Sequence, residues 1–337
     1  KCQYPFIIVD SPGGNAQNAF HFYKEWATQN KWICVLLVEA RNNDKDGLSY
    51  ANYVSTLNDM QQRFYIAPQS GIFTGFSGGA RRASTYARAF PKMAGAVCHA
   101  GAGASNLHKE KQLFTATICG DHCFNVNEIY DVYASMGKRG YYDIQQSGHN
   151  WYHKGKLIRA LDWLVNKMAQ RKKSPLPKRV VSHFLKAQYS QYKSEEKVLV
   201  KYQILKRMES LMKARRDALK TSSLLRKVFK KMSKRLHKLK SDKSFNLERR
   251  AYELFEKTYQ DYCVIGYAEA VNAAKSWSFK RSESGLIIKG TAENIKNSLV
   301  KMEGIVKKFK GTYAAGLASK EIERLSKLPE NLTKGGY

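Results

Sequence analysis

Residues Gly75–Gly79 read G-F-S-G-G and match the pattern G-x-S-x-G. In this pattern the serine sits on a sharp turn from a strand into a helix, where its hydroxyl stands clear of the backbone and can attack a carbonyl carbon. The neighbouring sequence fits that setting: residues 70–74 are typical of a turn and a short strand, and the alanine-rich residues 80–89 are typical of a helix. The sequence therefore predicts Ser77 as a nucleophile for acyl transfer.

A nucleophilic serine needs a base that takes its proton, and the base needs a carboxylate that orients it. His149 is the predicted base because it follows the last strand-like run of the first half and precedes the last helix there. Asp121 is the predicted acid because it lies just past the end of a strand-like run. The other carboxylates between Ser77 and His149 fall on predicted helices, inside a strand or in a lysine-rich loop; they are Glu110, Glu128, Asp131 and Asp143.

The elements that must position these residues alternate along the first half. Strand-like apolar runs lie at 6–9, 33–38, 72–74, 94–98 and 114–119, with a less apolar edge run at 140–145. Helical patterns lie near 17–30, 50–65, 79–90, 126–138 and 153–170. Apolar strands separated by helices predict a doubly wound, mostly parallel α/β sheet.

The second half has a different pattern. Two prolines among basic residues at 171–180 predict a linker between a sheet domain at 1–170 and an all-α helical domain at 181–337. Apolar residues beyond the linker recur at three- and four-residue steps, with further helices expected near 246–276 and 290–309.

The charge of the chain is strongly basic and uneven. The 337 residues hold 58 Lys and Arg against 28 Asp and Glu, a net charge of +30. Residues 1–174 contribute 21 basic and 12 acidic side chains, so 37 basic and 16 acidic ones remain for residues 175–337. A net charge of +21 on the second half attracts polyanions or an anionic surface, although a solvated helical surface explains it as well.

The six cysteines show no paired C-x-x-C zinc pattern. Cys119 and Cys123 are close enough in sequence to be bridged. His149 and His153 could present two imidazoles to zinc, but the sequence offers no third ligand, so neither a metal nor an organic cofactor is expected. No apolar stretch is long enough for a transmembrane segment. Because the chain starts at Lys1 and enters an apolar run at once, we expect that a leader has been removed and that the protein is secreted or periplasmic.

Residues 4–170 resemble the α/β-hydrolase superfamily, and in particular serine esterases of the dienelactone-hydrolase, polyhydroxybutyrate-depolymerase and feruloyl-esterase type. The resemblance rests on residues 10–16, Gly75–Gly79, 120–125 and Gly148-His149. It implies hydrolysis of a small-molecule or glycan-linked ester through an acyl-enzyme, with no cofactor. Trp151 and Tyr152 are expected near the substrate.

The first loop departs from the family pattern. Residues 10–11 are Asp-Ser where the family usually has His-Gly, and Pro12 has no N–H to give to an oxyanion. The resemblance then assigns the oxyanion hole to the amide of Gly78 and to that of Gly13 or Gly14.

The acid also departs from the family pattern, which is often Gly-x-x-Asp. Counting from Gly120 places Cys123 at the aspartate position, and Asp121 is two residues early. Either a shift of the loop lets Asp121 reach His149, or the acid is degraded and activity is low.

Three functions follow in order of preference. The first is a serine esterase whose helical half positions it on an anionic surface. The second is a catalytically degraded hydrolase shell that acts as a binding or scaffold protein through its basic helices. The third is a nucleic-acid-binding protein, for which residues 226–243 supply basic side chains at helical spacing but no reading motif.

Overall fold

The computed structural model describes residues 3–44, 47–103, 106–120, 123, 125–145, 147–151, 153–171, 174–217, 223–259 and 281–327. The chain divides into two compact units. The first comprises Lys1–Glu196 and Gln203–Ser233, and the second comprises Lys197–Tyr202 and Lys234–Tyr337.

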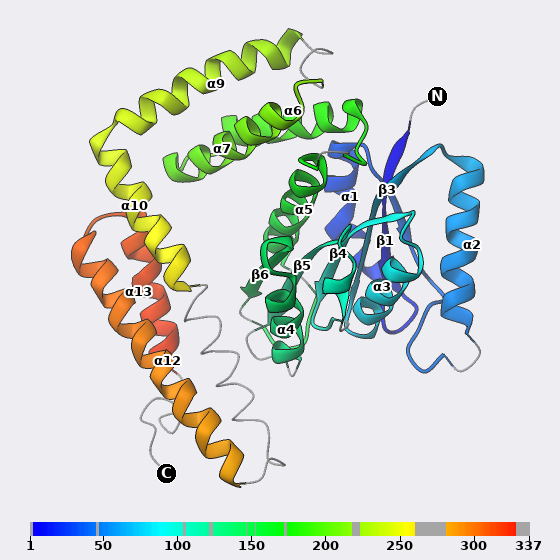
Figure 1. The fold of residues 1–337 in the computed structure, drawn as a ribbon, viewed down its shortest axis with the longest axis horizontal. Helices are drawn as coiled ribbons and strands as arrows, with labels where there is room; N and C mark the ends of the chain where they lie inside the picture. Colours follow the sequence, from blue (N-terminus) through cyan, green and yellow to red (C-terminus); the bar gives the residue numbers. More distant parts are fainter. Residues whose placement is uncertain are drawn as a thin grey trace. The chain divides into compact units, whose positions relative to one another are not determined.

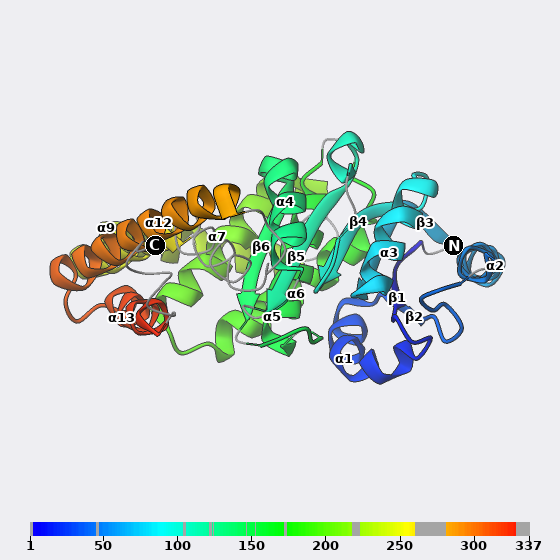
Figure 2. The same ribbon diagram turned by 90° about the horizontal axis from the view of Figure 1, so that it is seen from below.

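A six-stranded sheet forms the centre of the first unit, and every pair of neighbouring strands is parallel. The strand order is β2-β1-β3-β4-β5-β6, as Figure 2 shows along the sheet. The strands are β1 (Tyr4–Asp10), β2 (Ile33–Leu36), β3 (Ile66–Phe76), β4 (Ala94–Ala100), β5 (Phe114–Gly120) and β6 (Gly140–Gln145). All seven residues of β4 are buried, which is the burial expected of a strand covered on both faces. The predicted α/β fold class is confirmed.

Helices cover both faces of this sheet (Figure 1). One face carries α2 (Leu48–Arg63), α3 (Gly78–Ala89) and α4 (Val126–Met136), whose apolar side chains form one core with alternate residues of the strands, such as Phe6 and Ile8. The other face carries α1 (Phe20–Asn30) and α5 (Lys154–Ala169). The indole of Trp26 on α1 donates to the buried Asp162 carboxylate on α5 across 2.9 Å. Short 3-10 turns lie at Ala16–Ala19, Leu107–Lys109 and Gly137–Arg139.

Helix α6 (Lys178–Ser194) also packs within the first unit. Its Gln188 side chain donates to the second oxygen of Asp162 across 2.7 Å. Burial raises the pKa of the Asp162 carboxyl, and the two donors oppose that shift. The segment before α6 is held as well, because Arg215 at the end of α7 (Val198–Ala214) donates to the Ser174 hydroxyl and the Leu176 carbonyl, each across 2.9 Å.

The second unit is helical. Its helices are the second part of α9 (Ser223–Ser241), α10 (Lys243–Thr258), α12 (Arg281–Lys308) and α13 (Tyr313–Ser326). Glu248 on α10 accepts from the first two amides of α13, those of Tyr313 and Ala314, at 3.0 and 3.3 Å. These amides have no partner within their own helix, so the carboxylate caps α13 and joins it to α10. The helical second part is thus confirmed. None of the described helices could span a bilayer.

Candidate active site

Ser77 lies between β3 and α3 on a strained turn. Its φ and ψ are 52° and −124°, in a region that residues with a side chain seldom occupy. Two glycines make the turn sterically feasible. A Cβ on Gly75 would lie 2.6 Å from the Gly79 carbonyl carbon, and one on Gly79 would lie 2.6 Å from the Asp10 oxygen. Positions 75 and 79 therefore have no room for a side chain. The turn between them places Ser77 at the carboxyl edge of the sheet.

His149 is hydrogen-bonded to Ser77. The distance between His149 Nε2 and Ser77 Oγ is 2.7 Å, and the two residues are 72 positions apart in sequence. Gln145 at the end of β6 holds the loop that carries the histidine, since its side chain donates to the Trp151 carbonyl across 2.9 Å and accepts from the His153 amide across 2.7 Å. A serine hydroxyl bonded to an imidazole nitrogen is the arrangement that general-base activation requires.

The other ring nitrogen of His149 faces a cysteine. Cys123 Sγ lies 3.1 Å from His149 Nδ1 and is fully buried. A turn after β5 places it there, with the Cys123 amide donating to the Gly120 carbonyl across 3.0 Å. The predicted acid, Asp121, lies outside the described residues. Cys123 stands at the Gly-x-x-Asp position noted in the sequence, and its contact with the base was not foreseen.

The carboxylates set aside in the sequence analysis bind elsewhere where the structure gives their partners. Glu128 pairs with Arg81 and accepts from the Gly103 amide. Asp143 pairs with Lys156 and Arg159. Glu110 lies 3.7 Å from Arg88 and accepts from the Gln112 amide. Asp131 is exposed on α4.

The predicted oxyanion glycines occupy different backbone settings. Gly78 is the first residue of α3, and the amide of a first helical residue has no acceptor within its helix. The Gly14 amide donates to the Ser11 carbonyl across 3.3 Å, so of the two loop glycines Gly13 is the better placed to donate to a ligand. Asn42 also lies at this edge, because a Cβ on Gly78 would meet its Oδ1 at 1.8 Å. No sequence motif pointed to Asn42.

Comparisons with known proteins found similarity to solved structures alone, at low identity. No protein-family model matches the chain, and no curated protein matches it. Among solved structures, a ferulic acid esterase matches over 48% of this chain and 85% of its own, at 14% identity and a TM-score of 0.38. The apoenzyme of S-formylglutathione hydrolase from Staphylococcus aureus matches over 48% and 81%, at 12% identity and a TM-score of 0.38. A fluorophosphonate-binding serine hydrolase of the same species, solved with substrate, matches over 49% and 84%, at 13% identity and a TM-score of 0.39.

The first unit has a fold of the α/β-hydrolase type. We call it the sheet unit.

A buried ion pair supports the first loop of the sheet unit. Asp10, at the end of β1, is fully buried and accepts two hydrogen bonds from Arg82 of α3, at 2.7 and 3.0 Å, and one from the Tyr53 hydroxyl at 3.1 Å. Arg82 also donates to the Ser11 carbonyl across 2.8 Å and to Asn42 Oδ1 across 2.9 Å. One guanidinium thus fixes the loop that leads to Gly13 and Gly14, the predicted oxyanion glycines. This accounts for an aspartate at the position where the resembled families have histidine.

Aromatic rings lie next to His149. The Phe76 ring lies 4.7 Å from the His149 ring and 5.3 Å from Trp151, which stacks on Phe22 at 6.4 Å. All three aromatic side chains are partly exposed. Trp151 and His149 thus lie beside the same Phe76 ring, and a contact of Trp151 with substrate stays a prediction. Tyr152 lies outside the described residues.

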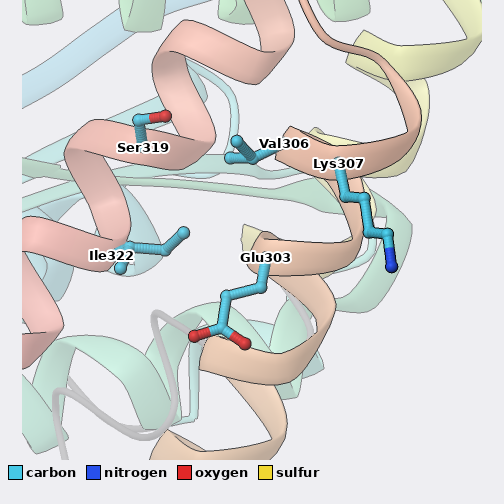
Figure 3. A pocket seen from close by; sticks show the side chains of 5 residues that line it. All are labelled: Glu303, Val306, Lys307, Ser319 and Ile322. Atoms are coloured by element: carbon cyan, nitrogen blue, oxygen red, sulfur yellow. The ribbon is translucent and has the colours of Figure 1, made fainter.

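A pocket in the second unit offers no comparable chemistry. It lies between α12 and α13 and is lined by Glu303, Val306, Lys307, Ser319 and Ile322 (Figure 3). These five residues include no histidine that could activate the serine. Within the described part of the chain, no group of three or more His, Cys, Asp or Glu side chains could hold a metal ion.

Proposed function

We propose that the chain is a serine hydrolase that cleaves a carboxylic ester through an acyl-enzyme. The observation that carries the proposal is the 2.7 Å hydrogen bond between Ser77 Oγ, on a strained strand-to-helix turn, and His149 Nε2. A scaffold protein has no use for such a pair, so the catalytically degraded alternative is less favoured. The substrate class we propose is a small-molecule or glycan-linked ester.

The first half of the reaction acylates the serine. His149 Nε2 takes the proton of Ser77 while Oγ attacks the ester carbonyl carbon, and the carbonyl oxygen becomes an oxyanion. The amides of Gly78 and Gly13 are the proposed donors to that oxyanion. When the intermediate collapses, the carbon–oxygen bond to the alcohol breaks, and the alcohol leaves with the proton from His149.

The second half releases the acid. A water molecule gives a proton to His149 and attacks the acyl carbon, and the new intermediate collapses with transfer of that proton back to Ser77 Oγ. A third group must keep a proton on His149 Nδ1 throughout, so that Nε2 can accept one. Asp121 is the group predicted from the sequence, and it stays a prediction.

Labelling with a fluorophosphonate probe tests the nucleophile. We expect the probe to modify Ser77 at a rate far above that of other serines, because its half-buried hydroxyl is bonded to a histidine. Ser84 is also bonded to a histidine, His99, but both side chains are fully buried. Mass spectrometry of the modified peptide identifies the site. Labelling should disappear in Ser77→Ala and persist in Ser55→Ala, a change at an exposed serine of α2. A folded protein that the probe leaves unmodified would remove the basis for a hydrolase.

The basic helices carry a second, independent proposal, namely an anionic surface or polyanion as partner. Helix α9 contains no acidic residue, and its exposed side chains include Arg226, Lys227, Lys230, Lys231, Lys234, Arg235, Lys238 and Lys240. Its apolar positions are buried at three- and four-residue steps, so the basic side chains share the outer face. Secretion of the protein also stays a prediction.

Salt-dependent retention on heparin tests this partner. We expect Lys230→Glu/Lys234→Glu/Lys238→Glu to elute at clearly lower salt than the wild type. With fewer lysines, the variant displaces fewer counterions from heparin when it binds, so its binding is weaker. The matched control is Lys24→Glu/Lys92→Glu/Lys109→Glu, which makes the same charge change at exposed lysines of the sheet unit outside α9. Equal shifts in the two triple variants would mean that α9 has no special part in the binding.

A further inference from the structure

We infer that Cys123 is the positioning residue of the catalytic base, and that its sulfur holds His149 Nδ1 in the role that a carboxylate has in most serine hydrolases. The inference rests on the proposed function and names the third member of its site. It assigns to the sulfur of Cys123 the orientation of His149, which the sequence predicted for the carboxylate of Asp121.

The contact itself has the required geometry. Sγ of Cys123 lies 3.1 Å from His149 Nδ1, on the side of the ring away from Ser77, which bonds Nε2 at 2.7 Å. The ring cannot turn freely between these two bonds. A Cβ on Gly101, whose φ is +63°, would lie 3.2 Å from Cε1 and Nδ1 of the histidine, so the backbone packs closely against the ring edge. The three residues come from the ends of β3, β5 and β6, as the members of a triad do in this fold.

The direction of the hydrogen bond decides whether the base works. If Nδ1–H donates to sulfur, Nε2 is left without a proton and can accept the one from Ser77. If the thiol donates to Nδ1, Nε2 carries the proton and cannot act as a base. A thiolate allows only the productive direction. A neutral thiol also allows it when its proton points to the Gly101 carbonyl, which lies 3.8 Å from Sγ.

The groups around Cys123 favour the thiolate. A hydrogen bond from Cys119 on β5 and the contact with His149 lower the pKa of the Cys123 thiol to about 5, against burial, which raises it. The backbone at Asn125, the N-cap of α4, also bonds the sulfur, and anions are stabilised at a helix N-terminus. Arg81 on α3 adds a positive charge within electrostatic range, although it is paired with Glu128. By contrast, burial alone raises the pKa of the Cys34 thiol to about 12.

A series of substitutions at Cys123 separates an orienting charge from simple packing. We expect Cys123→Ala to lower kcat about 10³- to 10⁴-fold with little change in KM, as loss of the orienting group does in other triads. Cys123→Asp should retain activity within about tenfold of the wild type because it restores a charged acceptor, and Cys123→Ser should fall between. If the sulfur only fills space, the order reverses: serine is tolerated best and a buried aspartate worst.

The controls use a second cysteine and the predicted acid. Cys34→Ala, on β2 and away from the site, should keep wild-type kcat. Thermal unfolding midpoints identify variants whose loss of activity reflects loss of fold. If Asp121→Asn removes activity while Cys123→Ala keeps it, the inference is wrong and the sequence prediction for Asp121 stands, with the hydrolase function intact.

Two measurements do not depend on turnover. Histidine nitrogen-15 NMR should report a proton on Nδ1 of His149 in the wild type and a mixture of tautomers in Cys123→Ala. The ultraviolet absorbance of thiolate at neutral pH should be lost in Cys123→Ala and kept in Cys34→Ala. If both signals are the same in Cys123→Ala and the wild type, the inference is overturned even for an active enzyme. If they change as expected in a protein that the fluorophosphonate leaves unmodified, the contact is real and the proposed function is what fails.

Discussion

Removing Ser77, His149 or both is expected to lower kcat for ester hydrolysis by about the same factor, on the order of 10⁶-fold. The two side chains share one hydrogen bond, so each depends on the other for its function. Without His149 the hydroxyl has no acceptor for its proton, and without Ser77 the imidazole has no nucleophile to activate. Their effects therefore do not add. The measurement is saturation kinetics on a chromogenic phenyl ester with Ser77→Ala, His149→Ala and the double variant.

The comparison needs a histidine outside the proposed machinery. His153 is exposed at the start of α5, four positions after the base, and His153→Ala should keep kcat within about twofold of the wild type. If the two single losses multiply in the double variant, Ser77 and His149 act separately and the serine–histidine mechanism is wrong. Residual hydrolysis in the double variant would come from donors to the oxyanion and from binding alone.

The pairing of Ser77 with His149 could be predicted from sequence because the signals for the two residues are local. Five consecutive residues around Ser77 specify the turn, since Gly75 and Gly79 must lie against other backbone atoms. His149 follows from chain order, because parallel strands bring their carboxyl ends to one edge. The helices of the sheet domain were predicted to within a few residues for the same reason, as α4 at Val126–Met136 illustrates.

Contacts between segments far apart in the chain could not be predicted from the sequence. The length of β3, Ile66–Phe76, depends on pairing with β1 across a register shift, and its first residues looked like a turn because they include Pro68, Ser70 and Gly71. The packing of α6 depends on the meeting of Gln188 with Asp162. The side chain that faces His149 Nδ1 could not be predicted either. The two candidates, Asp121 and Cys123, are only two residues apart in the sequence, and the path of the chain after β5 decides between them.

Arg82→Leu is expected to destabilise the sheet unit by about 3–5 kcal/mol at neutral pH. The substitution leaves the fully buried Asp10 carboxylate without its cation and removes the donors to Ser11 and Asn42. Burial raises the pKa of Asp10 and Arg82 opposes that shift, so loss of Arg82 moves the pKa further up. Between about pH 4 and the raised pKa, the Asp10 carboxyl of the variant binds a proton in the folded state but not in the unfolded state. The stability of the variant therefore falls as the pH rises through this range. Urea unfolding should therefore show a larger loss at pH 8 than at pH 5.

A neighbouring arginine provides the control for burial. Arg81 forms its ion pair with Glu128 at the surface, where the two side chains are 48% and 33% exposed, against 15% and 0% for Arg82 and Asp10. Solvent screens the exposed pair, so Arg81→Leu should cost no more than about 1 kcal/mol. Asp10→Asn/Arg82→Leu should recover part of the loss and should lose its dependence on pH between pH 5 and 8, because no carboxyl remains buried there and burial raises the pKa of the neighbouring Tyr53 hydroxyl well above its usual value of 10. If Arg82→Leu costs no more than Arg81→Leu, the first loop is held by other contacts, and the position of the Gly13 amide must be explained without this ion pair.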